Sequence, residues 1–216
     1  EILRCLVGSE MCIRDRLIYD IIFKECENMK IKVGVSNRHV HLSEKDLKTL
    51  FGEDYKLTIL KNLTQPGQYA CTETVTIETE KNSIQKVRVL GPVRNYTQVE
   101  ISKTDSYTLG LNPPIRDSGN LENSCGITLI GPKGKVKLEK GCIIANRHIH
   151  ATNEDLRKYN LNESELYDII IPGEKGGIIS NVKIKVDDSY SFELHIDTDD
   201  ANAHLIKNGD ILEIKN

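Results

Sequence analysis

The sequence predicts a mainly β protein with short helices (α+β). Its short strands, separated by turns, are typical of a β-barrel or a β-sandwich. Short runs rich in Val, Ile and Thr alternate with turn-forming residues, without the long helices that separate strands in a parallel α/β fold. A second observation is a repeat, because Asn-Arg-His-Val-His at 37–41 returns as Asn-Arg-His-Ile-His at 146–150. The chain is therefore expected to consist of two related halves.

The composition favours a soluble globular protein. The 216 residues suit one large domain or two small ones, and 28% charged and 38% hydrophobic residues are ordinary values. The net charge of −3 offers no broad basic surface, so neither nucleic acid nor a membrane is expected as a partner. The six cysteines are scattered without a CxxC pair, which is typical of free thiols in a reducing cytoplasm.

The N-terminal residues 1–28 are expected to lie outside the fold, as a non-native or targeting extension. Residues 5–16 show no sustained hydrophobic period and resemble a translated sequencing adapter, so Met29 is the expected start of the native chain. Residues 17–26 have apolar side chains near helical spacing. They are either the remnant of a short amphipathic targeting helix or upstream translation.

In the first half, residues 31–35 are expected to form a strand that leads into the first histidine pair. Ser43 has the position of an N-cap with Asp46 three residues later, which predicts a short helix that ends near Gly52. Short strands separated by turns follow at 56–60, 73–79, 83–90 and 98–102.

A long polar connection at 110–123 is the best candidate for a crossing or active-site loop. Beyond it the pattern predicts further strands and a second capped helix at 152–159. The strands expected in this part of the chain are 126–130, 135–138, 141–145, 166–171, 178–186 and 190–196.

The two histidine pairs are the main candidates for chemistry. Side chains alternate along a strand, so His39 and His41 point to one face, as do His148 and His150. Imidazole is a common metal ligand, and three protein ligands with one open position are typical of catalytic zinc. Exposed surface histidines are the alternative for a single pair, whereas the duplication favours metal binding.

Each half also offers a third ligand at the end of a strand. Glu100 and His195 have equivalent places in two segments that are followed by Thr- and Asp-rich residues. The expected metal sites are therefore His39, His41 and Glu100 in one half, and His148, His150 and His195 in the other.

Arg94 and the loop segment 116–119 are candidates for binding an anionic substrate. Arg94 is expected in a turn after residues 91–93, where its planar guanidinium could bind phosphate or carboxylate. The loop could offer the hydroxyl of Ser118 and backbone N–H groups to an anion. The alternative for Arg94 is a solvated surface charge, and the alternative for the loop is an ordinary turn.

Three further basic residues each have a possible binding role and an alternative. Lys61 lies near the expected turn at 65–67 and could meet a phosphate, with a solvated lysine as the alternative. Arg38 and Arg147 each precede a ligand and point to the opposite strand face. They could contact the substrate there, or pair with Asp.

The candidate residues fall within motifs at 35–43, 63–68, 89–94, 97–102, 146–150 and 195–199. Together these motifs resemble the PduL-type phosphotransacylases, the phosphate propanoyltransferase family. The resemblance extends over residues 30–216. Its departures are Ala151 and Asp200, where Met and Glu are frequent, and neither is an expected ligand.

The resemblance implies two small antiparallel β-barrel domains, with 38–145 as the first and 146–216 as the second, which the N-terminal strand 30–37 joins. It also implies reversible transfer of a short-chain acyl group, propanoyl or acetyl, between CoA and phosphate at two zinc ions per chain. The six residues named above would hold zinc, Arg94 would bind phosphate, and Ser118 would assist at the anion. Phosphate would then attack the thioester directly, and a zinc ion would accept the CoA thiolate.

The family likeness further implies a homodimer in the bacterial cytoplasm. A genuine helix at 17–26 would extend this to a bacterial microcompartment, with its shell or enzymes as partners. Two alternatives stay open: a binuclear metallohydrolase, in which the metals activate water, and a non-enzymatic duplicated metal-binding module. The single carboxylate, Glu100, argues against the first, and Arg94 argues against the second.

Overall fold

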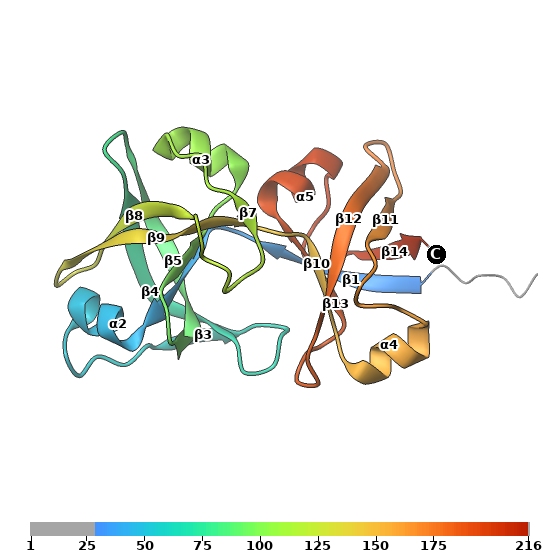
Figure 1. Cartoon of the computed structure of the whole chain (residues 1–216), viewed down its shortest axis with the longest axis horizontal. Coiled ribbons are helices and arrows are strands. Elements are labelled where there is room, and N and C mark those ends of the chain that lie inside the picture. The colour runs from blue at the N-terminus through green and yellow to red at the C-terminus, as the bar shows by residue number, and fades with distance from the viewer. Residues whose placement is uncertain (1–28, 216) are drawn as a thin grey trace, which may run out of the picture.

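The structure, a computed structural model, describes residues 29–215, which form two six-stranded β-barrels that lie side by side along the long axis of the molecule (Figure 1). The prediction of a mainly β chain with short helices and two barrels is confirmed. The expected extension at 1–28, with its candidate helix at 17–26, lies outside the described residues.

The first barrel closes because β4 (Tyr69–Glu78) pairs with β8 (Cys125–Ile130). In barrel order its strands are β4, β5 (Ser83–Arg94), β2 (His39–Ser43), β6 (Gln98–Glu100), β9 (Lys135–Ala145) and β8. Two short strands add to its margins, β3 (Ile59–Asn62) on β4 and β7 (Ile115–Arg116) on β9. Its helices are α2 (Glu44–Phe51) and α3 (Lys103–Leu109).

The second barrel has the same order of equivalent elements. Its strands are β11 (Tyr167–Ile171), β12 (Gly177–Val186), β10 (His148–Ala151), β13 (Glu193–Asp197), β1 (Met29–Ser36) and β14 (Ile211–Lys215). Its helices are α4 (Asn153–Tyr159) and α5 (Thr198–His204).

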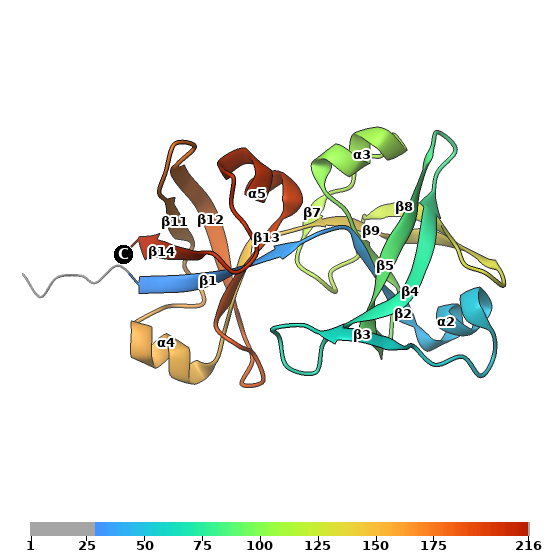
Figure 2. The same cartoon turned by 180° about the vertical axis from the view of Figure 1, so that it is seen from behind.

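The two barrels exchange one strand each. β1 pairs with β13 and β14 of the second barrel, although the chain continues directly into β2 of the first. In the same way β9 belongs to the first barrel and continues into β10 of the second. Figure 2 shows β1 running from one barrel toward the other beside the path of β9. The chain therefore crosses between the barrels directly before each histidine motif, which places both motifs at the interface.

Each barrel encloses its own apolar core, and the histidine strands are anchored in these cores. Val40 of β2 is fully buried in the first core, and Ile149 of β10 is fully buried in the second. Because neighbours on a strand point to opposite faces, burial of Ile149 directs His148 and His150 away from the core. Burial of one such side chain contributes about 1.5–3 kcal/mol, which holds the ligand-bearing strand in place.

All four helices of residues 29–215 begin at a side-chain cap. The predicted caps are confirmed, because the side chains of Ser43 and Thr152 accept hydrogen bonds from the backbone N–H groups of Asp46 and Asp155. Helices α3 and α5 were not predicted. They begin at Ser102 and Asp197 in the same way, so the repeat extends to a second helix in each half.

The barrels are mixed rather than purely antiparallel as expected. β2 pairs in parallel with β5, and β10 pairs in parallel with β12. β6–β9 and β1–β13 are also parallel pairs. Parallel neighbours need a long connection, and the helix and strand between β10 and β12 provide it.

The turn expected at Arg94 is wrong, because β5 continues through Gly91 and Pro92 to Arg94. Arg94 pairs with Ser43 of β2, and a register shift between His41 and Ser43 accommodates the added length. Arg94 thus lies at the end of a strand that neighbours the histidine pair.

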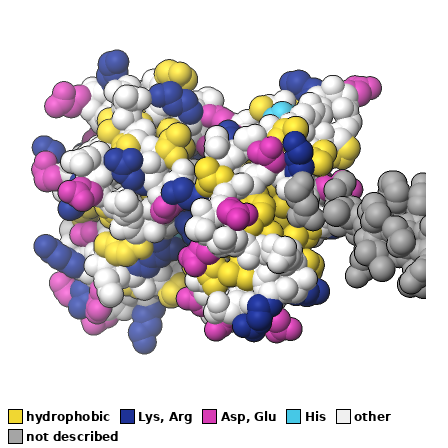
Figure 3. Space-filling view, turned by 45° about the vertical axis from the view of Figure 1, so that its right-hand side comes forward, with side chains coloured by type: hydrophobic (Ala, Val, Ile, Leu, Met, Phe, Trp, Pro, Cys, Tyr) yellow, Lys and Arg dark blue, Asp and Glu magenta, His cyan; other side chains and the backbone are white. Residues whose placement is uncertain are grey.

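The surface carries both charge signs. Basic and acidic side chains are interspersed over the face in Figure 3, in line with the small net charge of −3. Within 29–215, every helix is too short or too polar to cross a membrane.

Candidate metal and anion site

The first histidine cluster is built on two adjacent strands. His39 and His41 lie on β2, and Glu100 ends β6 directly opposite His39 in the antiparallel register. Their ligand atoms all lie within 4.8 Å of one another, and His39 Nε2 lies 3.5 Å from Glu100 Oε2. Both histidines are buried. The structure therefore brings together the three residues predicted for this half.

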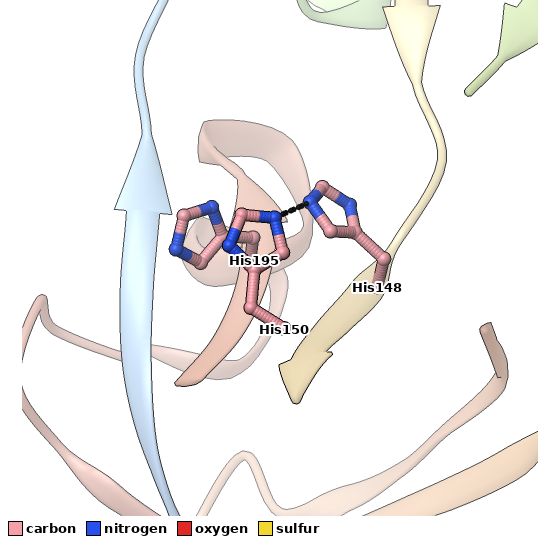
Figure 4. A group of neighbouring side chains, drawn as sticks. All are labelled: His148, His150 and His195. Atoms are coloured by element: carbon pink, nitrogen blue, oxygen red, sulfur yellow. Dashed lines mark hydrogen bonds between the residues drawn. The ribbon is translucent and has the colours of Figure 1, made fainter. Parts of the chain in front are cut away.

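The second cluster repeats this arrangement in the other barrel. His148 and His150 lie on β10, and His195 of β13 lies directly opposite His148. The ligand atoms again lie within 4.8 Å of one another, and the Nε2 atoms of His148 and His150 are 2.9 Å apart (Figure 4). Within residues 29–215, these two clusters are the groups of three or more His, Cys, Asp or Glu side chains that could hold a metal ion.

The repeated asparagine orients the first histidine of each motif. His39 Nδ1 donates to the backbone carbonyl of Asn37 at 2.8 Å, and His148 Nδ1 donates to that of Asn146 at 2.7 Å. A nitrogen that faces a carbonyl carries the proton, so the Nε2 lone pair of each ring stays free for a cation. The crossing segment thus fixes the ring orientation that metal binding needs.

The donor sets fit a divalent metal. Burial lowers the pKa of His150 to about 3, and burial lowers the pKa values of His41 and His148 well below 6.5. These rings are therefore neutral at neutral pH, the form that binds metal. In addition, His41 Nδ1 and His150 Nδ1 are buried without a hydrogen-bond partner among the described residues. Neutral imidazoles that face one another around a small space, with one carboxylate in one cluster, suit zinc with an open position.

Arg94, at the end of β5, acts electrostatically on residues of both barrels. Its charge lowers the pKa of His41 in the first barrel, secondary to burial, and it also acts on the pKa of Tyr190 in the second. The ring of Tyr190 stacks on that of His150, with centroids 4.1 Å apart. The Nη1 group of Arg94 donates to Ser118 at 3.1 Å, while its Nε and Nη2 groups donate to no described residue. Half of the guanidinium fork is therefore available to an anion.

Gln98, which sequence reasoning missed, connects the anion loop to the first cluster. Its Nε2 group donates to Glu100 Oε1 and to Ser118 Oγ, the latter at 2.8 Å. Its Oε1 atom accepts from the backbone N–H of Gly119 at 2.8 Å. Gln98 is fully buried, so it holds the loop, the carboxylate and Arg94 in one network. Its place two residues before Glu100 on the same strand was the signal available in the sequence.

Contacts between the barrels close both sides of the interface. The loop residue Asp117 accepts hydrogen bonds from Asn146 at 2.7 Å and from Lys183 at 3.0 Å. On the other side, Gln65 Nε2 donates to the carbonyl of Ser191 at 3.0 Å, and the N–H of Ser191 donates to Gln65 Oε1 at 3.1 Å. These contacts join segments that flank the two histidine clusters.

Glu193 is a further buried carboxylate at the second cluster. Its Oε2 atom lies 2.9 Å from His195 Nε2 and also accepts from Gln65 at 3.3 Å. Burial raises the pKa of Glu193, but its interactions with His195, Gln65 and Thr64 together lower the pKa overall. Since the Nε2 atom of His195 contacts Glu193, the Nδ1 atom is the nitrogen of this ring that could bind a metal ion.

The other predicted basic residues lie outside this network. Arg147 makes a bidentate ion pair with Asp200, at 2.8 and 2.6 Å, and Arg38 pairs with Asp105. The structure shows the pairing with Asp that was one of the roles expected for both arginines, and substrate binding by Arg147 stays a prediction. Lys61 is exposed on β3 and makes no hydrogen bond or ion pair with a described residue.

Strand exchange and two histidine clusters at one interface define a double-barrel protein with a composite candidate site. Comparison with known proteins identifies the class. A family model of phosphate propanoyltransferase matches residues 32–207. The chain therefore belongs to the phosphate propanoyltransferase family, and it is an acyltransferase.

Curated relatives named phosphate propanoyltransferase match the chain over most of its length. The relative from Thermotoga maritima is 51% identical over 200 residues, which are 92% of this chain and 94% of the relative. The relative from Clostridioides difficile is 46% identical over 93% of this chain and 96% of the relative. The relative from Rhodobacter capsulatus is 45% identical over 92% and 93%, respectively.

Proposed function

We propose that this chain is a zinc-dependent phosphate acyltransferase that interconverts propanoyl-CoA and phosphate with propanoyl phosphate and CoA. The observation that carries the proposal is the presence of two three-residue donor clusters, the first of which is joined through Gln98 to Ser118 and Arg94. The six cluster residues are the proposed zinc ligands, three to each of two ions. Arg94 and Ser118 are the proposed phosphate contacts.

The chain's own residues bind and orient the phosphate. The Nε and Nη2 groups of Arg94 would donate to two phosphate oxygens. The hydrogen bonds of buried Gln98 would keep the guanidinium and the loop in position. A third phosphate oxygen would then attack the thioester carbonyl carbon. The carbon–sulfur bond breaks, and CoA leaves as the thiolate while acyl phosphate forms.

A protein thiol is not needed as the nucleophile. Burial raises the pKa of Cys71 to about 11 and that of Cys142 to about 12, so both stay protonated at neutral pH. Both are fully buried in the described structure and lie in the core of the first barrel or beside it. Direct attack by phosphate is therefore favoured over attack by either of these two thiols.

The two donor clusters differ in their third donor, which is the carboxylate of Glu100 in one and the imidazole of His195 in the other. Bound zinc would supply a Lewis acid that neutralises phosphate and a soft acceptor for the departing thiolate. Three imidazole donors would leave more of a bound ion's charge uncompensated than two imidazoles and a carboxylate would. This difference supports separate roles for the two halves.

Further parts of the proposal concern the acyl group, the assembly and the location. Propanoyl is proposed from the names of the relatives, with acetyl as a second substrate to be compared. A homodimer in the bacterial cytoplasm, inside a microcompartment if 17–26 is a targeting helix, stays a proposal. The domain division into 38–145 and 146–216, joined by 30–37, is supported by the exchange of β1.

The test is to incubate the purified, zinc-loaded protein with propanoyl-CoA and follow free thiol with and without phosphate. Release that depends on phosphate, with propanoyl phosphate as product, is the expected result. Release without phosphate would identify a hydrolase, and no release would favour a binding module. Parallel reactions with acetyl-CoA rank the two acyl groups.

A further inference from the structure

Lys185 lies on the strand face that carries the second histidine cluster. In the parallel pair of β10 and β12, Lys185 is directly opposite His150, and Lys183 is directly opposite His148. Cross-strand partners share a face of the sheet, so both lysines project on the side of the histidines. The ammonium of Lys183 reaches Asp117 of the first barrel at 3.0 Å. This face of β12 is therefore directed across the interface.

Charged groups of the first barrel act on Lys185. Its ammonium interacts electrostatically with the carboxylates of Glu100 and Asp117 and with the guanidinium of Arg94. It also acts on both histidines of the second pair. Lys185 on β12 of the second barrel and Arg94 on β5 of the first therefore act on one another across the interface.

Lys185 has no direct partner there. Its side chain is only partly exposed, yet within 29–215 no residue accepts a hydrogen bond or ion pair from its Nζ atom. The neighbouring Lys183, by contrast, is paired with Asp117. A cation withdrawn from water without a partner is costly, and a bound anion would offset that cost.

The internal repeat shows that the fold does not require this cation. On β5 of the first barrel, Arg88 lies opposite His39 and Leu90 lies opposite His41. Leu90 thus has the position equivalent to Lys185, and Arg88 is satisfied by the carbonyls of Cys71 and Thr72. The unpaired cation is a property of the second half alone, which points to function rather than to folding.

We propose that Lys185 is a second phosphate-binding residue that faces Arg94 across the barrel interface. Each barrel would then supply one cation to the same phosphate group, so the anion site is complete only when both barrels are in place. This inference rests on the proposed phosphate acyltransferase function. The phosphate concerned is the inorganic phosphate or acyl phosphate at the reacting centre, and the diphosphate of CoA is the other source that the experiment separates.

The experiment compares Lys185→Leu, which installs the residue of the equivalent position, with Lys185→Arg, which keeps the charge. Lys183→Leu is the matched control, because it removes a cation from the same face of the same strand. For each zinc-loaded variant, the KM for phosphate and the KM for propanoyl-CoA are measured separately. Calorimetric titration with inorganic phosphate alone gives a binding constant that does not depend on turnover, and circular dichroism and zinc content check the fold.

Lys185→Leu is expected to raise the KM and the Kd for phosphate by at least about tenfold, the order expected for a lost charged hydrogen bond. The KM for propanoyl-CoA should stay within about threefold, and Lys185→Arg should recover most of the loss. Lys183→Leu should change phosphate binding by less than about threefold.

Three results would overturn the inference: unchanged phosphate binding in Lys185→Leu, an equal loss in Lys183→Leu, or a rise confined to the KM for propanoyl-CoA. The last result would assign Lys185 to CoA. If the wild-type protein releases no thiol, the proposed function fails, and the phosphate titration alone still decides the role of Lys185.

Discussion

Glu100 lies directly opposite His39 in the β2–β6 pair, at the position that His195 occupies opposite His148 in the β10–β13 pair. The third donor of each cluster is thus set by strand register, and it is the one donor that differs chemically between the halves. Two equivalent sites would become inequivalent through this single difference in charge.

Replacing the third donor should remove one zinc ion at a time. Glu100→Ala and His195→Ala should each lower the zinc content from about two to about one per chain, because two remaining ligands hold zinc poorly. Acyl transfer should fall by at least about a hundredfold in both. Inductively coupled plasma mass spectrometry and the thiol assay measure the two effects.

The control for these variants is His204→Ala. His204 is the one histidine outside both clusters, and its Nδ1 atom faces the carbonyl of Lys175 on the surface. It should keep both zinc ions and full activity. If His195→Ala also keeps two zinc ions, the assignment of His195 is wrong.

Removal of Arg94 should weaken phosphate use more than acyl-CoA use. Arg94→Ala should lower kcat/KM for phosphate by about a hundredfold or more, and Arg94→Lys should recover only part of it because a point charge lacks the planar fork. Ser118→Ala should cost less, because Ser118 is one hydroxyl beside Arg94. Initial rates at varied phosphate measure this, with the exposed Arg157→Ala as control. Equal losses for phosphate and propanoyl-CoA would argue against a phosphate role for Arg94.

Sequence alone predicted much of the site, because the local rules that create it are short-range. Alternation along a strand is enough to place His39 and His41 on one face. Duplication of the motif made metal binding more probable than chance exposure, and Ser43 and Thr152 are recognisable caps. The equivalence of Glu100 and His195 followed from their matching contexts.

The rest depended on contacts between distant parts of the chain. Exchange of β1 and β9 between barrels leaves no local pattern, and only the family resemblance suggested it for β1. Gln65 and Ser191 meet across the interface from opposite halves of the sequence. Lys185 looks like an ordinary polar residue of an alternating strand, because its lack of a partner is a property of the tertiary structure.

The missed helices α3 and α5 are a different case. Their capping residues were visible as Ser102 followed by Asp105, and Asp197 followed by Asp200. Each helix has seven residues, too few for a hydrophobic period to show. The capping pattern alone was the usable signal.

Loss of Arg147 should reduce stability rather than catalysis. Its ion pair with Asp200 fixes the first turn of α5 to the start of β10, and the arginine is partly exposed, so Arg147→Ala should cost about 1–2 kcal/mol of unfolding free energy. Urea unfolding of the metal-free protein measures this. The KM for phosphate should stay within about twofold. A large rise in that KM with unchanged stability would restore Arg147 as a substrate contact.

Acid should destabilise the metal-free protein, because the buried histidines stay neutral in the fold. Burial holds the pKa of His150 at about 3, whereas the same group titrates near about 6.5 in the unfolded chain. The unfolded state therefore binds more protons below pH 6.5, so this stability is present above that pH and is lost as the pH falls toward 3.

The Tm of chelator-treated protein between pH 7 and pH 4 tests this expectation. The Tm should fall with pH in the wild type, less steeply in His150→Gln, and as in the wild type in His204→Gln. A wild-type Tm that rises as the pH is lowered from 7 to 4 would show that His150 is charged in the fold.

The most direct test of the two-site transferase is a zinc titration of the metal-free enzyme in the presence of propanoyl-CoA and phosphate. Thiol release should depend on phosphate, should require zinc, and should reach its maximum at about two zinc ions per chain. Full phosphate-dependent release by the metal-free protein, or a maximum reached at one zinc ion, would contradict the account.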